Sequence, residues 1–180
     1  MISITIKKLI LISILVFFSS NIFAIDASKV PKDRQSTTGL YFTSLEASDH
    51  VAKQGDSTLF IDIRDPVEIF TVGMPNAVDT NITFKYVDPT LWNEKKSTFG
   101  FKSNPNFLKD VDIRLKEKGL TSSDTIILFC GSGKRAAKAA SALKKAGFSK
   151  VYSVMDGYKA WQKADLEWSR KLDKQKVLVK

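Results

Sequence analysis

The segment from Thr125 to Gly147 constrains the fold of this chain more than any other part of the sequence. Thr125 to Phe129 is a continuous apolar run, as expected for a central parallel strand that is buried on both faces. The run ends at Cys130, and after a short loop with two glycines the chain becomes alanine-rich with helical spacing. The apolar face of this predicted helix consists of Ala136, Ala137, Ala140 and Leu143.

Strand and helix patterns alternate along the rest of the chain. Short strands are predicted at 59–63 and 151–154, and a turn at 74–78 leads into another strand. Helices are predicted at 43–54, from 65 onward for a short turn, at 104–119 and at 158–164. This alternation indicates an α/β fold, a layered domain with a mainly parallel central sheet. Active sites in such sheets lie at the carboxyl ends of strands, which is where Cys130 falls.

The domain is predicted to span residues 37–166, between a flexible segment at 25–36 and a basic C-terminal tail at 167–180. Residues 85–104 have no clear periodicity and are predicted to form the longest loop. Loops of this length often cover a functional site. Trp92 in this segment either forms a wall of the site or covers the sheet.

The first 24 residues have the pattern of a secretory signal peptide. Lys7 and Lys8 form a basic start, residues 9–18 are apolar, and a polar exit with small residues ends at Ala24. The apolar run is shorter than the roughly 20 residues that a spanning helix needs. We therefore expect cleavage near Ala24, no stable membrane anchor afterwards, and a periplasmic or secreted protein; the alternative is an uncleaved anchor.

The net charge restricts the classes of partner. The chain has formal net charge +9, and residues 1–24 hold two of its 28 basic residues and no acidic one, so the remainder carries +7. A basic surface suits nucleic acid, anionic lipid or small anionic substrates. Because the chain has no array of basic and aromatic residues, we expect no nucleic-acid partner.

Cys130 is the only cysteine of the chain. Exported proteins use cysteines in pairs, so a lone thiol is buried and inert, an intermolecular link, or reactive. The loop that follows can turn its backbone N–H groups towards the sulfur, and the next helix adds partial positive charge at its N-terminus. Such surroundings favour the thiolate. The pattern therefore predicts an enzyme that works through a nucleophilic sulfur, with a loop of Gly131, Ser132, Gly133, Lys134 and Arg135.

Four motifs in order make the chain similar to the rhodanese domain family over about residues 40–166. The sequence from Cys130 to Arg135 matches the active loop Cys-x-x-Gly-x-Arg of that family. Leu59 to Arg64, with Glu68 beyond, matches its Leu-Ile-Asp-Val-Arg-x-x-x-Glu signature. Residues 72–77 resemble a degraded Gly-His-Ile-Pro-Gly-Ala motif. Residues 151–157 with Trp161 match the closing segment, in which Asp156 replaces the first of two usual glycines.

This resemblance implies a three-layer fold with helices on both faces of the sheet, and sulfurtransferase chemistry without a metal or cofactor. The Cys130 thiolate takes the outer sulfur of thiosulfate or a related small anionic donor, and a persulfide remains. A small thiol, a thiol of a protein or cyanide then accepts that sulfur. The N–H groups from Gly131 to Arg135 would stabilise both the thiolate and the persulfide.

Three other functions are compatible with the same resemblance, and the sequence disfavours two of them. Phosphatases built on this fold place the arginine one position further along the loop, and here that position is Ala136, so a phosphatase is disfavoured. A persulfide carrier that serves a partner protein needs the same loop as an enzyme, and the sequence does not separate the two. A degenerate domain used only for protein contacts is disfavoured by the intact loop.

The charged residues around the loop have two interpretations each. Arg135 is predicted to guide an anionic donor, whereas Lys134 fits that role and an ordinary helix start equally well. Asp62, Arg64 and Glu68 are predicted to form ion pairs and hydrogen bonds that support the loop, and Arg64 has a further interpretation as a contact of the donor. The only histidine, His50, is expected on the surface of a helix rather than in catalysis.

Overall fold

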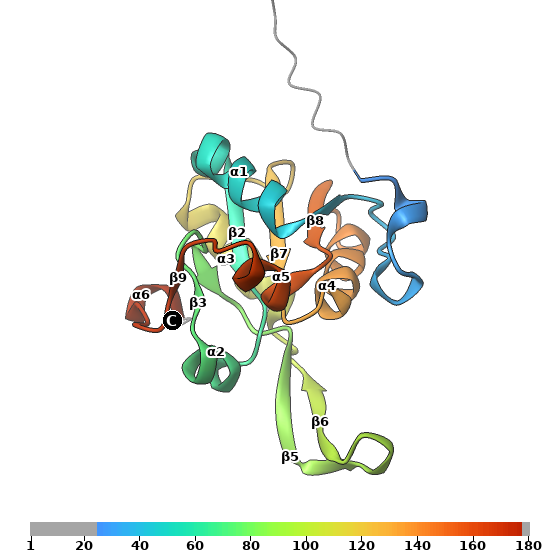
Figure 1. Cartoon of the computed structure of the whole chain (residues 1–180). Coiled ribbons are helices and arrows are strands. Elements are labelled where there is room, and N and C mark those ends of the chain that lie inside the picture. The colour runs from blue at the N-terminus through green and yellow to red at the C-terminus, as the bar shows by residue number, and fades with distance from the viewer. Residues whose placement is uncertain (1–24, 178–180) are drawn as a thin grey trace, which may run out of the picture.

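A computed structural model describes residues 25–177. Its centre is a five-stranded sheet in the order β1-β8-β7-β2-β4, with every neighbouring pair parallel (Figure 1). The strands are β1 (Tyr41–Phe42), β2 (Thr58–Asp62), β4 (Thr80–Asn81), β7 (Thr125–Phe129) and β8 (Lys150–Val154). The predicted central strand is confirmed, since β7 lies in the middle of the sheet and is buried from Ile126 to Phe129.

Helices cover both faces of this sheet, so the structure has three layers. The six α-helices of the described residues are α1 (Ser44–Gln54), α2 (Pro66–Val72), α3 (Phe107–Glu117), α4 (Lys134–Lys145), α5 (Gly157–Lys163) and α6 (Lys174–Val177). One core cluster joins α3 and α4 to Ile126 and Leu128 of β7. A second cluster joins α1, α2 and α5 to Ile127 and Phe129, the alternate residues of the same strand. The predicted α/β fold class is confirmed.

Capping boxes start two of the helices, and the first of them is predicted by the sequence Thr43-Ser44-Leu45-Glu46. Thr43 forms a capping box with Glu46 at the start of α1, and Asp65 forms one with Glu68 at the start of α2. Each box satisfies backbone N–H groups that have no partner within the helix. The box of α2 matters for the site, because it holds Glu68 in the first turn after β2.

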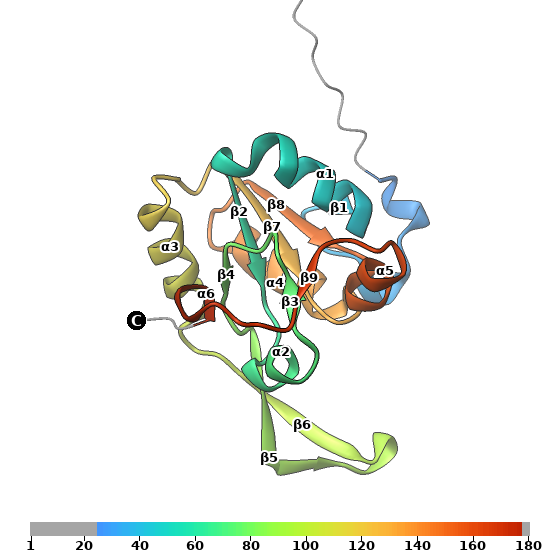
Figure 2. The same ribbon diagram turned by 60° about the vertical axis from the view of Figure 1, so that its left-hand side comes forward.

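The prediction of a loop at 85–104 is wrong. β5 (Lys85–Asn93) and β6 (Thr98–Ser103) form an antiparallel hairpin, with a 3-10 turn η4 (Glu94–Lys96) at its tip. The hairpin projects away from the body of the domain (Figures 1 and 2). Both of its faces meet solvent, and β5 lacks the regular alternation of apolar and polar residues that marks a half-buried strand. An irregularity between Asp88 and Trp92 interrupts the register as well.

Both ends of the described chain pack against the domain instead of extending freely. Residues 25–36, expected to be flexible, contain the 3-10 turns η1 (Ala27–Lys29) and η2 (Lys32–Arg34), and Val30 between them is buried. The expected tail contains β9 (Trp168–Ser169), which pairs with β3 (Met74–Pro75), and α6. Leu172 and Val177 pack on the second core cluster. Tertiary contacts with remote residues order both segments, although neither has a strong local pattern.

Two placements within helices also differ from expectation: that of His50, and that of Leu108, whose spacing with Val111 and Leu115 predicts a place on the apolar face of the 104–119 helix. His50 is buried, not exposed, and its Nε2 lies 3.0 Å from Thr58 Oγ1. Burial lowers the pKa of His50 because it disfavours the charged ring. In α3 the buried face uses Phe107, Val111 and Leu115, while Leu108 is exposed. A fourth 3-10 turn, η3 (Gly55–Ser57), connects α1 to β2.

The predicted signal peptide at 1–24 lies outside the described residues. Across residues 25–177, the helices are all too short or too polar to cross a membrane.

Candidate active site

Cys130 directly follows β7 and is fully buried. Its carbonyl oxygen accepts a hydrogen bond from the Tyr158 N–H at 3.1 Å. The chain then turns through Gly131 and Ser132 to Gly133, the N-cap of α4. The nucleophile predicted from the sequence is therefore held at the carboxyl end of the central strand and at the start of a helix. That the loop N–H groups face the sulfur stays a prediction.

Two glycines let the loop pack closely against the turn between β8 and α5. Gly133 has φ +81°, and a Cβ atom there would lie 2.1 Å from the carbonyl oxygen of Met155. Gly157 has φ +64°, and a Cβ atom there would lie 2.5 Å from the carbonyl oxygen of Cys130. A larger residue at either position would push the loop and the turn apart because its Cβ would clash with these carbonyl oxygens. The positive φ angles are a second reason for glycine at both positions.

Asp156, which replaces a glycine of the family motif, has a regular backbone with φ −104°. Its carboxylate accepts hydrogen bonds from the backbone N–H of Ser44 at 3.0 Å and from the Ser44 hydroxyl at 2.7 Å. The replacement therefore needs no strained conformation. It also connects the start of α1 to the turn that supports the cysteine loop.

Asp62 and Arg64 form a buried ion pair beside the loop. Arg64 donates from Nε and Nη2 to the Asp62 carboxylate, the shorter contact being 2.6 Å, and Nη2 also donates to the Gly73 carbonyl at 2.8 Å. The Arg64 guanidinium lies 5.4 Å from the ring centre of Phe129 and 5.3 Å from that of Trp168. These contacts fit the predicted supporting role, because they occupy the charged group within the core.

Glu68 and Arg135 form a second ion pair, which the sequence does not connect. Arg135 Nη1 donates to Glu68 Oε2 at 2.5 Å and Nη2 donates to Oε1 at 2.6 Å. Burial by itself raises the pKa of the Glu68 carboxyl, but the hydrogen bonds and charge of Arg135 outweigh it, so this pKa lies below its ordinary value. The guanidinium predicted to meet an anionic donor is thus already neutralised by a carboxylate.

Lys134 points to a different part of the molecule. Its Nζ lies 2.5 Å from Asp33 Oδ2, and both side chains are about half exposed. The hydrogen bond from Lys134 lowers the pKa of Asp33. This contact ties the N-terminal segment to the start of α4 and favours a structural interpretation of Lys134.

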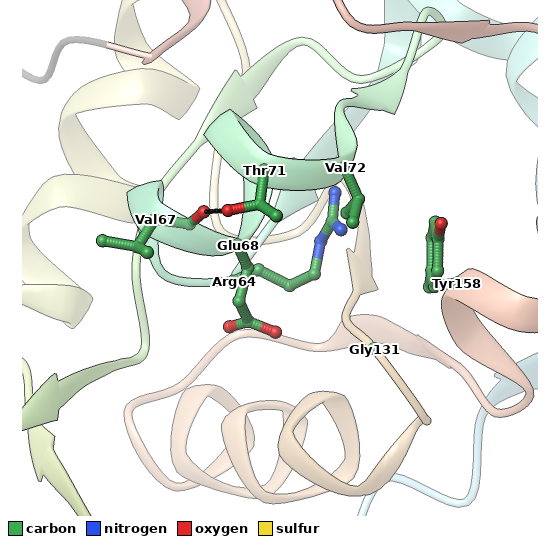
Figure 3. A pocket seen from close by; sticks show the side chains of 7 residues that line it. All are labelled: Arg64, Val67, Glu68, Thr71, Val72, Gly131 and Tyr158. Atoms are coloured by element: carbon green, nitrogen blue, oxygen red, sulfur yellow. Dashed lines mark hydrogen bonds between the residues drawn. The ribbon is translucent and has the colours of Figure 1, made fainter. Parts of the chain in front are cut away.

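A pocket of about 320 Å³ opens beside the loop (Figure 3). Val67 and Tyr158 lie at opposite ends of the view, and the Glu68 carboxylate is turned towards α4. The wall is mainly apolar, and it consists of Arg64, Val67, Glu68, Thr71, Val72, Gly131 and Tyr158. Sequence reasoning missed Val67, Thr71, Val72 and Tyr158. Two signals were available: Val67, Thr71 and Val72 lie close together in α2, and Tyr158 directly follows the Asp156-Gly157 turn.

The site brings together most of the residues predicted for it. The loop, Asp62, Arg64 and Glu68 all lie at the carboxyl end of β2 and β7, while Lys134 turns away. The described residues contain no cluster of three or more His, Cys, Asp or Glu side chains that could hold a metal ion.

Comparisons with known proteins place these features in context. The model of the rhodanese-like domain family matches residues 45–164. Thiosulfate sulfurtransferase 16, chloroplastic, of Arabidopsis thaliana is 40% identical over 107 residues, which cover 59% of this chain and 76% of that protein. The senescence-associated protein DIN1 of Raphanus sativus is 30% identical over 106 residues, 59% of this chain, and the chain spans about half of its length (49%).

Among solved structures, the polysulfide-sulfur transferase homodimer of Wolinella succinogenes is similar to this chain with a TM-score of 0.49 and 20% identity. The likeness covers 77% of this chain and 80% of that one.

Proposed function

This chain belongs to the rhodanese-like domain family, and from that premise we propose that it is a sulfurtransferase that carries sulfane sulfur on Cys130. The observation that carries the proposal is the position of the thiol. The only cysteine of the chain stands at the carboxyl end of the central strand, at the start of a six-residue loop that closes with Arg135 on a helix. A relative named as a thiosulfate sulfurtransferase supports the reaction class.

The proposed reaction has two displacement steps. The Cys130 thiolate attacks the outer sulfur of the donor, forming a new S–S bond while the old S–S bond breaks; with thiosulfate, sulfite leaves with the electron pair. An acceptor thiolate or cyanide then attacks the outer sulfur of the persulfide, and the electron pair of the broken bond returns to Cys130. This is covalent catalysis with two half-reactions, and it needs no external oxidant or reductant.

The ion pairs around the pocket favour the carrier form of this function over rapid use of small dianions. Asp62 neutralises Arg64 and Glu68 neutralises Arg135. Because an anionic donor gains most from a free cation, thiosulfate would bind weakly here. A donor or acceptor that brings its own binding surface fits the site better. The enzyme and carrier forms use the same persulfide chemistry and differ only in their rate of turnover.

A mass measurement tests the persulfide. Intact wild-type protein, incubated with thiosulfate or with polysulfide, should gain one sulfur atom and lose it again on addition of cyanide. Cys130→Ser should gain none, because it removes the only thiol. Sulfur transfer by Cys130→Ser would contradict the mechanism. Hydrolysis of aryl phosphates by wild-type protein that forms no persulfide would assign the site to a phosphatase instead.

We also propose export through cleavage near Ala24, since residues 1–24 combine a basic start, a short apolar run and a small-residue exit. N-terminal sequencing of the protein from a periplasmic or secreted fraction should then begin near Ile25. Full-length protein confined to membranes would contradict this proposal.

A further inference from the structure

The β5–β6 hairpin exposes a group of large apolar side chains next to the active site. Leu91, Trp92, Phe99 and Phe101 are between 46% and 54% exposed. Two contacts fix the base of the hairpin at the site: the Val87 N–H donates to Asp65 Oδ2 at 2.7 Å, and the Phe101 ring centre lies 5.5 Å from the Arg135 guanidinium carbon. A contiguous exposed apolar patch on a protein commonly marks an interaction site.

The strand register places three of these side chains, Trp92, Phe99 and Phe101, on one face of the ribbon together with Val87. Val87 is opposite Phe101, and Trp92 is opposite Phe99. Opposite residues share a face, as do alternate residues of one strand, so Val87, Phe101, Phe99 and Trp92 line the same side, which we call the hairpin face. The rings of Trp92 and Phe99 meet edge to face with centres 5.7 Å apart. Tyr86 lies on the other face, opposite Lys102.

The hairpin face continues into the wall of the pocket. Phe101 contacts Arg135, Arg135 pairs with Glu68, and Glu68 lines the pocket together with Gly131. Val67, which also lines the pocket, is 64% exposed. A molecule that covered the hairpin face would therefore lie beside the pocket.

We propose that the hairpin face docks a protein partner that has an acidic surface and presents a cysteine to Cys130. This inference rests on the proposed sulfur transfer and names its partner. Charge supports an acidic partner, because residues 85–103 contain four lysines against Asp88 and Glu94, a net charge of +2. The paired arginines support a macromolecular substrate, because they leave a small anion little to bind.

The position of the apolar residues favours a protein over a membrane. The tip of the hairpin, residues 93–97, is entirely polar, with Lys95 and Lys96 at its end. A hairpin that enters a bilayer needs its apolar side chains at the leading end, because charged groups are costly there. In this hairpin the apolar residues lie along the flank that leads to Cys130.

The exchange balances without a further reagent. The partner's thiolate, its proton lost to solvent, attacks the outer sulfur of the Cys130 persulfide. The bond between that sulfur and Cys130 Sγ breaks, the electron pair returns to Sγ, and a persulfide forms on the partner. The reverse reaction loads Cys130 from a partner persulfide by the same bonds.

A set of synthetic acceptors tests the docking. The probes are a short peptide with one cysteine among aspartate, glutamate, leucine and phenylalanine, the same peptide with lysines for its acidic residues, and glutathione. Full-length protein is loaded with polysulfide, and transfer is followed by mass. For the wild type, kcat/KM for the acidic peptide should exceed that for the lysine peptide by about tenfold or more. This is the size of effect expected when one hot-spot residue of an interface is removed.

Variants on the two faces of the ribbon separate docking from general damage. The double variant Trp92→Ser/Phe99→Ser should lose about tenfold or more in kcat/KM for the acidic peptide, and Lys95→Glu/Lys96→Glu should reduce its preference over the lysine peptide. Tyr86→Ser removes an aromatic ring from the opposite face and should change neither. Transfer to glutathione should be the same in all of these proteins, with unchanged thermal unfolding.

Each remaining outcome overturns a defined part of the inference. Normal persulfide loading with no effect of Trp92→Ser/Phe99→Ser would remove the docking role and leave the proposed function intact. Failure of the wild type to load sulfur would remove the proposed function itself. If the wild type sediments with anionic phospholipid vesicles and the same double variant does not, the hairpin face binds a membrane instead. If the wild type is a dimer in sedimentation equilibrium and the double variant is not, the hairpin face binds a second copy of this chain.

Discussion

At the scale of single residues, the Glu68–Arg135 pair influences both stability and donor binding. The pKa of Glu68 is lowered in the folded protein, so the pair contributes fully above the ordinary carboxyl value of 4.5 and is lost as the pH falls through the lower folded value. Glu68→Gln should cost about 1–3 kcal/mol at neutral pH, and the difference should shrink below pH 4.5. The KM for thiosulfate should fall, because Arg135 becomes free to bind an anion.

Glu117→Gln is the matched control for this prediction. Glu117 also pairs with an arginine, Arg114, at 2.8 Å, but its side chain is 54% exposed. Surface pairs contribute less than about 1 kcal/mol, so urea unfolding and thiosulfate kinetics of this variant should stay close to wild type. If Glu68→Gln and Glu117→Gln had equal effects at neutral pH and below pH 4.5, the position of Glu68 beside the loop would add nothing to stability or to donor binding.

At the scale of elements, the cysteine loop keeps its shape because the β8–α5 turn packs against it. Gly133→Ala and Gly119→Ala both place a side chain on a left-handed backbone, with φ +81° and +73°, which costs about 1–2 kcal/mol. Only at Gly133 does the new Cβ also meet a backbone atom, Met155 O at 2.1 Å; at Gly119 the space is open. Gly133→Ala should therefore shift the loop and slow persulfide formation by about 10²-fold.

The comparison of these two alanine variants isolates the packing of the loop. Gly119→Ala should form the persulfide at the wild-type rate, although its thermal unfolding temperature falls. Quenching the reaction with polysulfide at successive times and measuring the intact protein mass gives the rate of persulfide formation for each variant. If both variants load sulfur equally fast, the contact between Gly133 and Met155 does not set the geometry of the site.

At the scale of the whole molecule, the C-terminal segment closes the domain over its buried ion pair. Trp168 donates from Nε1 to the Val72 carbonyl at 2.6 Å, and its ring contacts the Arg64 guanidinium. Trp168→Ala should lower the free energy of unfolding by roughly 3 kcal/mol, because it removes ring packing and opens the core to water. Trp92→Ala, on the exposed hairpin, should change it by less than about 0.5 kcal/mol. Equal losses in urea unfolding would contradict this account of the closure.

Features that depend on neighbouring residues could be predicted from the sequence. The apolar run at 125–129 could only be satisfied inside a sheet, the capping boxes of α1 and α2 are built within four residues, and the alanine face of α4 follows from helical periodicity. For the same reason the position of Cys130 at the end of a strand was predictable. A local pattern is sufficient where the residue types themselves require burial, or where the contacts that satisfy the pattern lie within a few residues of each other.

Contacts between remote residues became visible only in the folded protein. Glu68 and Arg135 are 67 positions apart, and nothing in either segment shows that the guanidinium meets this carboxylate instead of a substrate. His50 becomes buried against β2, and residues 168–177 gain their order from the pocket wall and core that they cover. The hairpin at 85–103 has no buried face. Its first strand, β5, lacks the alternation that the hydrophobic effect imposes elsewhere, and only the pairing of the two strands reveals the hairpin.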